Sequence, residues 1–341
     1  MEKYHKYLQE SLILHNELLL QNNVSLGDLS TLYIGGGTPS LWGSNGIDFL
    51  ISCLKKRGIT ISSDCEFTVE LNPGGWNKSD LIKLRESGVN RVSVGVQSLS
   101  KQTLKALDRI HTLDDVYRAL DALAEIGFNF SVDFMLGLPK EKTGKRNILN
   151  EVSKILTFNP SHLSSYILTV NKNYIHYSDL PDENIISEEY LEFSTYMQEN
   201  GFEHYEISNF SKPGARSRHN MKYWNGESVA AIGPSATGFV RKGVASGVRY
   251  KWKTIDTPKY SVEEISEYDF KLERFFLSLR TSDGTNLLDF INAKNIREVE
   301  SFIRQIDKHG HLSSAKIDNI ILSPSGFLCA DSITARLISY L

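Results

Sequence analysis

Three segments of strand length in the first half of the chain carry apolar side chains at every second position. Successive side chains of a strand point to opposite faces, so each segment predicts one apolar face and one small or polar face. The apolar sets are Phe67, Val69 and Leu71; Val92, Val94 and Val96; and Phe130, Val132 and Phe134. Doubly wound sheets are apolar on both faces, whereas a barrel directs one face to its helices and the other to a ligand. The alternation therefore favours a full or partial barrel.

Helical segments separate these strands, which is the pattern of repeated βα units on a parallel sheet. Further strands are expected to begin near Thr31 and Leu163. Ser79 and Asp80 can cap a helix that stops at Gly88, and Thr112 with Asp115 predicts a capping box for a helix that ends at Gly127. The fold class expected from this pattern is α/β.

Polar side chains lie at or near the carboxyl ends of three of these strands: Glu70, Gln97 and Asp133. Sheets and barrels of this class place their sites at that end, so the three side chains are expected to converge. Two alternatives stay open. Each residue can cap a following loop or helix, or the polar face can enclose only water.

The first strand ends in a glycine turn, Gly35-Gly36-Gly37-Thr38-Pro39. Three glycines allow a sharp turn and leave backbone N–H and C=O groups accessible to a ligand. The turn is neither a P-loop nor G-x-G-x-x-G, because no Gly-Lys-Ser/Thr follows and the spacing differs. Alone, such a turn is more often structural than functional.

Composition and charge limit the class of protein. The 341 residues include 38 basic and 41 acidic side chains, and the net charge of −3 argues against general nucleic-acid binding. Cys53, Cys65 and Cys329 are too few for a disulfide scaffold and too far apart for a zinc motif. The first residues lack the apolar segment of a signal peptide, and no stretch approaches the ~20 apolar residues of a membrane helix. The sequence therefore predicts a cytoplasmic globular protein without an integral membrane segment.

The second half changes character after about Val170. A helix over 186–200 precedes a segment rich in glycine and aromatic residues that runs to Trp252. A helical block is expected from about 261 to 308, followed by short strands around 317–322 and a last helix, as in a small winged-helix module. The domain boundaries expected are therefore 1–170 for a partial barrel, 171–255 for a mixed extension and 256–341 for a C-terminal domain.

Four ordered motifs strongly resemble the radical S-adenosylmethionine superfamily, in its branch of oxygen-independent coproporphyrinogen III oxidases. They are the glycine turn, Glu70-Leu71-Asn72-Pro73, the segment 88–98 and Asp133-Phe134-Met135-Leu136-Gly137-Leu138-Pro139. The segment His204-Tyr205-Glu206-Ile207-Ser208-Asn209-Phe210, with His219-Asn220 and Tyr223-Trp224, is similar to the HemW family of heme chaperones in that branch. The resemblance covers about residues 31–338.

The resemblance implies a binding site for S-adenosylmethionine. It assigns Gly35, Gly36, Gly37 and Thr38 to the turn that meets the methionyl amino group, and Glu70 to the carboxylate that pairs with it. It assigns Gln97, Arg109 and Asp133 to the positions that hold the carboxylate and the ribose. A guanidinium and two carboxylates suit a zwitterionic amino acid that carries a ribose diol.

One family feature is missing. Members hold a [4Fe–4S] cluster with a C-x-x-x-C-x-x-C loop after the first barrel strand, and this sequence has no such loop. Met1 aligns just after the expected end of that loop. A truncated reading frame explains the absence, and genuine loss of the cluster is the rival. We expect no metal ligands for the cluster in this sequence and weakened binding of S-adenosylmethionine.

The resemblance also implies heme or porphyrin as a ligand. His219, flanked by Tyr223 and Trp224, is the first candidate for an axial ligand, and His111 and His204 are weaker candidates. Alternatively, His219 holds the backbone of a turn and the aromatic rings pack in the core. The leading hypothesis is a heme-binding chaperone that delivers heme to an acceptor protein. The alternatives are a coproporphyrinogen oxidase-like radical enzyme, if a missing N-terminus supplies the cluster, and a decayed homologue that binds neither ligand.

Overall fold

The computed structural model describes residues 1–37, 39–139 and 146–341. The chain divides into two compact units, each formed from separate stretches of sequence. Unit 1 comprises Met1–Ser30, Asp48–Cys65 and Ser217–Leu341, and unit 2 comprises Thr31–Ile47 and Glu66–Arg216. These compact units are discontinuous in sequence, so they do not test the domain boundaries expected at 170 and 255. Those boundaries stay a prediction.

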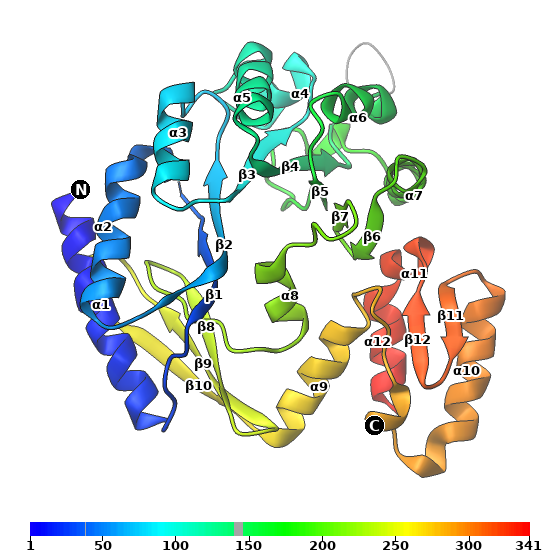
Figure 1. Cartoon of the computed structure of the whole chain (residues 1–341). Helices are drawn as coiled ribbons and strands as arrows, with labels where there is room; N and C mark the ends of the chain where they lie inside the picture. The colour runs from blue at the N-terminus through cyan, green and yellow to red at the C-terminus, as the bar shows by residue number, and fades with distance from the viewer. Residues whose placement is uncertain (38, 140–145) are drawn as a thin grey trace. The chain divides into compact units, whose positions relative to one another are not determined.

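Unit 2 is built on a curled sheet in the order β1-β2-β3-β4-β5-β7-β6 (Figure 1). The strands from β2 to β5 pair in parallel, and β7 pairs antiparallel with both β5 and β6. The strands are β1 (Leu29–Ile34), β2 (Ile61–Leu71), β3 (Arg91–Gln97), β4 (Asn129–Leu136), β5 (His162–Ile167), β6 (Glu203–Glu206) and β7 (Asn209–Ser211). The expected α/β partial barrel is confirmed.

Helices cover the apolar face of this sheet, as the alternating pattern requires. They are α3 (Lys78–Glu86), α4 (Lys101–Ala106), α5 (Leu113–Ile126), α6 (Ile148–Leu156) and α7 (Glu183–Glu199). The same part of the chain also forms the short 3₁₀ turns η1 (Pro39–Leu41) and η2 (Tyr177–Asp179) and the helix α2 (Gly43–Lys56), which continues from unit 2 into unit 1. The side chains of Val92, Val94 and Val96 are fully buried, as are those of Leu120 and Leu123 on α5.

The helix termini mostly follow their capping signals. Thr112 and Asp115 form the expected capping box, and α5 ends at Gly127, which has a φ of 76°. The expectation for α3 is wrong by two residues. The N-cap residue is Asn77 and not Ser79 or Asp80. The Asn77 side chain accepts from the Asp80 amide, and the Asp80 side chain accepts from the Asn77 amide, which together form a capping box.

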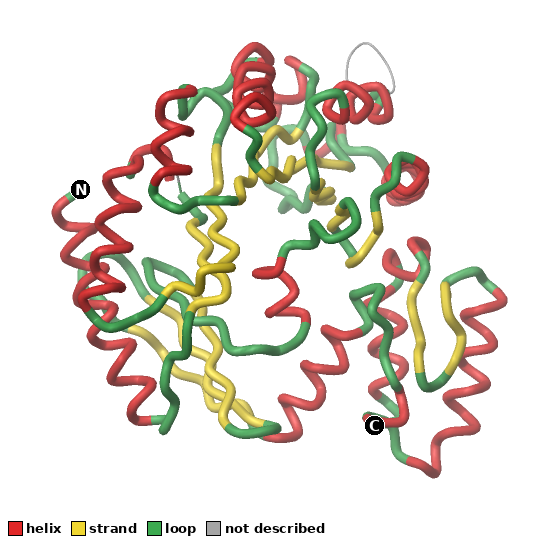
Figure 2. Tube along the Cα trace, viewed as in Figure 1, coloured by secondary structure: helices red, strands yellow, loops and turns green. Residues whose placement is uncertain are grey.

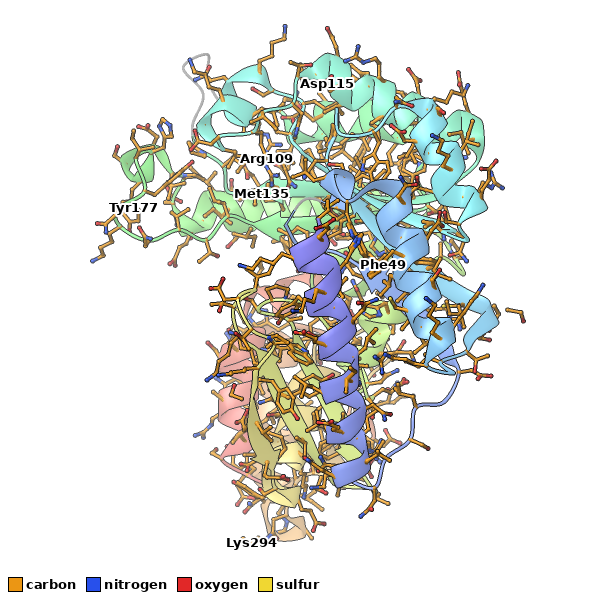
Figure 3. All side chains as sticks on the ribbon, turned by 90° about the vertical axis from the view of Figure 1, so that its left-hand side faces the viewer. Phe49, Arg109, Asp115, Met135, Tyr177 and Lys294 are labelled. Carbon is orange, nitrogen blue, oxygen red and sulfur yellow. The ribbon has the colours of Figure 1, made fainter. Side chains whose placement is uncertain are left out.

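Unit 1 contains a three-stranded antiparallel sheet in the order β10-β9-β8, whose core includes residues of the N-terminal helix α1 (Glu2–Gln21). Its strands are β8 (Thr237–Lys242), β9 (Ser246–Trp252) and β10 (Tyr260–Ile265). The core between them contains Tyr7, Leu18, Leu19, Val240, Val248, Tyr250 and Trp252. Figure 3 labels Phe49 of α2 in the same unit, and its ring stacks on His5 of α1 at a centroid distance of 3.9 Å.

The rest of unit 1 is mainly helical, with one hairpin, as the tube in Figure 2 shows. Its elements are α8 (Arg218–Trp224), α9 (Glu267–Ser278), η3 (Leu287–Asp289), η4 (Ala293–Asn295), α10 (Ile296–Lys308), β11 (Leu312–Lys316), β12 (Asn319–Leu322), α11 (Pro324–Leu328) and α12 (Ala330–Ile338). The helical block expected over 261–308 is wrong at its start, because 260–265 forms the edge strand β10. There Glu263 pairs with Arg249 of β9 across the ladder.

Candidate functional site

The polar face of the unit 2 sheet is the centre of the candidate site. Residues that pair in register on parallel strands point to the same face, and the pairs Glu70–Ser93, Ser93–Ser131 and Gly95–Asp133 therefore share one surface. On β5 the pairing of Asp133 with Ser164 extends this surface. The structure thus brings Glu70 and Asp133 together on the face that the alternation predicted to be polar.

Glu70 is held by the end of the first strand. Its Oε1 accepts from the Tyr33 hydroxyl at 2.7 Å and its Oε2 accepts from the Gly36 amide at 2.8 Å. A Cβ at Gly35 would lie 2.5 Å from the Tyr33 ring and 2.6 Å from Oε1, so only glycine leaves room for both side chains there. Gly36 and Gly37 have φ values of 75° and 60°. Thr38 lies outside the described residues.

Asp133 is the second carboxylate of this face. It accepts from the Ser93 hydroxyl at 3.0 Å, and the Ser164 side chain also hydrogen-bonds it. Burial raises the pKa of Asp133 to about 6, with a smaller contribution from the negative charge of Glu70. The Glu70 and Asp133 charges together also raise the pKa of Tyr33, for which burial is the largest cause.

Gln97 ends β3 in an unusual conformation. It has a φ of 66° beside a register irregularity, and Gly95 accommodates its folded side chain, since a Cβ there would lie 3.1 Å from Nε2. The side chain is buried, and its Oε1 has no hydrogen-bond partner among the described residues. A buried unsatisfied acceptor at the carboxyl end of a strand fits a ligand that donates a hydrogen bond.

Arg109 is not brought to the two carboxylates by any contact of the described residues. It lies in the loop between α4 and α5 (Figure 3), where its amide donates to the Leu104 carbonyl. Its positive charge lowers the pKa of His111, although burial is the larger cause. The assignment of Arg109 to a ligand stays a prediction.

Sequence reasoning missed two phenols and a guanidinium of this face. The Tyr33 hydroxyl donates to Glu70. Burial raises the pKa of Tyr166 to about 12, and the negative charge of Asp133 makes a smaller contribution. Arg91 is 3% exposed, and its charge favours ionised Asp133. The alternation of His162, Ser164 and Tyr166 along β5 is the signal that would have extended the polar face.

The three candidate histidines differ in their environment. His204 is half-buried, with Nε2 3.2 Å from the Tyr190 hydroxyl and Nδ1 2.9 Å from the Ser194 hydroxyl. His111 is buried beside the backbone of Val96, and its Nε2 has no partner among the described residues. His219 lies partly exposed on α8, with the Tyr223 ring 5.4 Å away and nearly perpendicular. Tyr223 is 46% exposed, so it does not pack in the core as the alternative proposed.

The cysteines do not fit an iron–sulfur cluster. Cys53 and Cys65 are buried in α2 and β2, and Cys329 lies between α11 and α12. Within residues 1–37, 39–139 and 146–341, no three His, Cys, Asp or Glu side chains converge as ligands of a metal ion. The described residues therefore do not fit the cluster.

No helix within the described ranges is both long and apolar enough to cross a membrane. Among the described residues, the acidic and phenolic face of unit 2 and the partly exposed imidazole of unit 1 both have ligand chemistry. The carboxylates of the first feature can pair with an ammonium group and accept hydrogen bonds from hydroxyls. The second feature offers a nitrogen ligand beside an aromatic ring.

Comparisons with known proteins show the family and the fold to which this chain is similar. Residues 15–151 match the model of the radical SAM superfamily. The heme chaperone HemW of Buchnera aphidicola (Schizaphis graminum) is 32% identical over 247 residues, which cover 69% of this chain and 65% of that protein. HemW of Lactococcus lactis is 32% identical over 281 residues, which cover 77% of this chain and 72% of that protein. The coproporphyrinogen III oxidase HemN of Escherichia coli has the same fold, with a TM-score of 0.79 and 18% identity over all of this chain and 83% of the other.

Proposed function

We propose that this chain, which belongs to the HemW family of radical S-adenosylmethionine proteins, binds heme and transfers it to an acceptor protein. The observation that carries the proposal is the accessible motif His219-Asn220-Met221-Lys222-Tyr223-Trp224 on α8. His219 and Tyr223 are four residues apart, so they lie on one face of the helix. The same proposal places the exchange in the cytoplasm.

The residues of α8 suit a flat, iron-bearing ligand. Imidazole nitrogen is a common axial ligand of heme iron, and a half-exposed phenol ring beside it offers apolar surface to a porphyrin. Ser217 caps the helix by accepting from the Asn220 amide at 3.3 Å, which fixes the turn on which His219 is carried. Ligand exchange with an acceptor requires accessible iron ligands, and the exposure of this helix supports such exchange.

S-adenosylmethionine is the second proposed ligand, on the polar face of unit 2. Glu70 and the Gly36 turn would hold the methionyl ammonium group, since each carboxylate oxygen keeps a lone pair beyond its present bond. Asp133 would accept from the ribose hydroxyls, and Gln97 Oε1 would gain a partner. Radical chemistry needs an electron from a cluster, and the cysteines of this chain do not fit one. Enzymatic oxidation of a porphyrinogen is therefore not proposed for the chain as it stands.

Titration with hemin tests the heme proposal. The full chain is expected to bind one hemin with a shifted Soret band, and H219A is expected to lose at least tenfold in affinity and to change the band position. H309A is the matched control, because His309 is also exposed and lies at the end of α10. If wild type shows no saturable binding, the function is wrong. If wild type binds but H219A binds equally, only the assignment of His219 is wrong.

A further inference from the structure

The segment between Lys172 and Lys212 has an unusual charge. It contains nine acidic residues and neither lysine nor arginine, although the whole chain has a net charge of only −3. This segment comprises the loop before α7, α7 itself and the strands β6 and β7. Glu203 is paired with Arg216 and Glu206 is buried, so the exposed carboxylates of the segment, on α7 and the loop before it, give this side of unit 2 a negative field that attracts cationic groups.

Side chains of α6 and α7, which Figure 1 labels, line a groove on unit 2. Two neighbouring hollows of about 240 and 440 Å³ share the side chains of Leu149 and Glu192, so they form one continuous depression. The larger hollow is lined by the apolar side chains of Leu149, Leu191 and Tyr196 and by the carboxylates of Glu188, Glu192 and Glu199. It is thus an apolar floor with an acidic rim.

The carboxylates of the rim have no cationic partner among residues 1–37, 39–139 and 146–341. Glu188, Glu192 and Glu199 are exposed, and none of them forms an ion pair within the part of the chain that the structure describes. The cation at the end of the groove, Arg146, is already paired with Glu151 at 2.6 Å and donates to the Met135 carbonyl. The rim therefore has unused capacity to pair with positive charges.

We propose that this groove is the docking site for a basic amphipathic helix of a partner protein. Apolar side chains at helical spacing would contact Leu149, Leu191 and Tyr196, and flanking lysines or arginines would face the three glutamates. Nucleic acids and anionic lipid surfaces carry the same sign of charge as the rim, so they are repelled. The groove belongs wholly to unit 2, and the proposal does not depend on heme binding.

A labelled peptide of 14 residues, with leucine at helical spacing and lysine elsewhere, provides the probe. Fluorescence anisotropy with the full chain is expected to give saturable binding that weakens with salt. The charge reversal E188K/E192K is expected to weaken it at least tenfold, and L191S severalfold at constant charge. The matched control is E86K/D121K, because both residues are exposed on α3 and α5 of the same unit and lack ion pairs among the described residues. Circular dichroism checks that every variant is folded.

Four results would overturn the proposal. They are the absence of saturable binding, equal binding of a peptide with glutamate in place of lysine, an equal loss in E86K/D121K, and a groove variant that binds as wild type does. Sedimentation of the chain alone tests whether a second copy of the chain occupies the groove. A dimer that E188K/E192K dissociates would show that a second copy fills the groove, which contradicts a separate partner.

Discussion

Glu206 is the one carboxylate of the motif His204-Tyr205-Glu206-Ile207-Ser208-Asn209-Phe210, and it has no exposed surface. It accepts from the Ser208 amide at 3.0 Å and from the Asn209 side chain. These donors favour the ionised form, but burial is the larger effect and raises the pKa of Glu206 to about 7. A residue that the family motif marks is thus a carboxyl group that titrates near neutral pH.

This pKa predicts how stability depends on pH. The folded protein holds the Glu206 proton more tightly than the unfolded chain, whose value is 4.5, so this contribution is complete below pH 4.5 and is lost as the pH rises through about 7. At about 1.4 kcal/mol per pKa unit, the loss amounts to at most about 3.5 kcal/mol. E206Q is therefore expected to be more stable than wild type at pH 8 and to show a flatter dependence between pH 5 and 8 in urea unfolding.

Asn209 makes the substitution tolerable. Its Oδ1 has no partner within the described residues, so an inverted amide could accept from the glutamine side chain that E206Q introduces. E86Q, at an exposed carboxylate, is the control and should follow the wild-type pH profile. An E206Q profile parallel to that of wild type would show that Glu206 does not hold a proton near pH 7.

The turn after β1 is the element on which the polar face of unit 2 depends. Gly35 leaves room for the Glu70 carboxylate because it has no Cβ, and the Gly36 amide donates to that carboxylate. G35A is expected to displace Glu70 and to cost about 1 to 3 kcal/mol, as for other substitutions that overfill a packed site. Thermal unfolding measures the cost, and equilibrium dialysis with S-adenosylmethionine measures the loss of the ligand site.

Gly27 is the matched control, because a Cβ there would meet nothing within 4 Å. G27A is expected to change the free energy of unfolding by less than about 0.5 kcal/mol. A double-mutant cycle isolates the contact. In the E70A background the carboxylate is gone, so G35A should cost less there than in wild type. An equal cost in both backgrounds would contradict the role given to Glu70.

Elements with strong local signals were the ones that could be predicted. The alternation along β3 and the capping box of Thr112 and Asp115 are encoded within a few residues, and both are confirmed. The strand β10 was not predicted, because glutamates are common in helices and the sequence does not show that Glu263 pairs with Arg249 of the neighbouring strand β9. The Tyr33 hydroxyl and Glu70 are 37 residues apart, so only the folded sheet reveals that contact.

At the scale of the whole molecule, the cysteines bear on whether this chain holds the cluster that its superfamily is known for. Cys53 lies in α2, Cys65 in β2 and Cys329 between α11 and α12, and the described residues bring no three such ligands together. A [4Fe–4S] cluster needs several thiolates at one point. The chain as it stands therefore retains a polar face suited to the organic ligand but lacks thiolates placed to hold its iron partner.

Anaerobic reconstitution with iron and sulfide tests this conclusion. After desalting, the chain is expected to retain no more iron than the variant C53S/C65S/C329S and to show no absorbance near 410 nm. S-adenosylmethionine is expected to bind weakly, because in the superfamily the cluster chelates its amino and carboxylate groups. Stoichiometric iron that is absent from the triple variant would mean that the cysteines converge in solution. Tight binding of S-adenosylmethionine to the iron-free chain would mean that Glu70 and Asp133 hold this ligand without a cluster. Hemin titration of the same iron-free sample should still give the Soret shift, since the ligand assigned to heme is an imidazole of α8 and requires no thiolate.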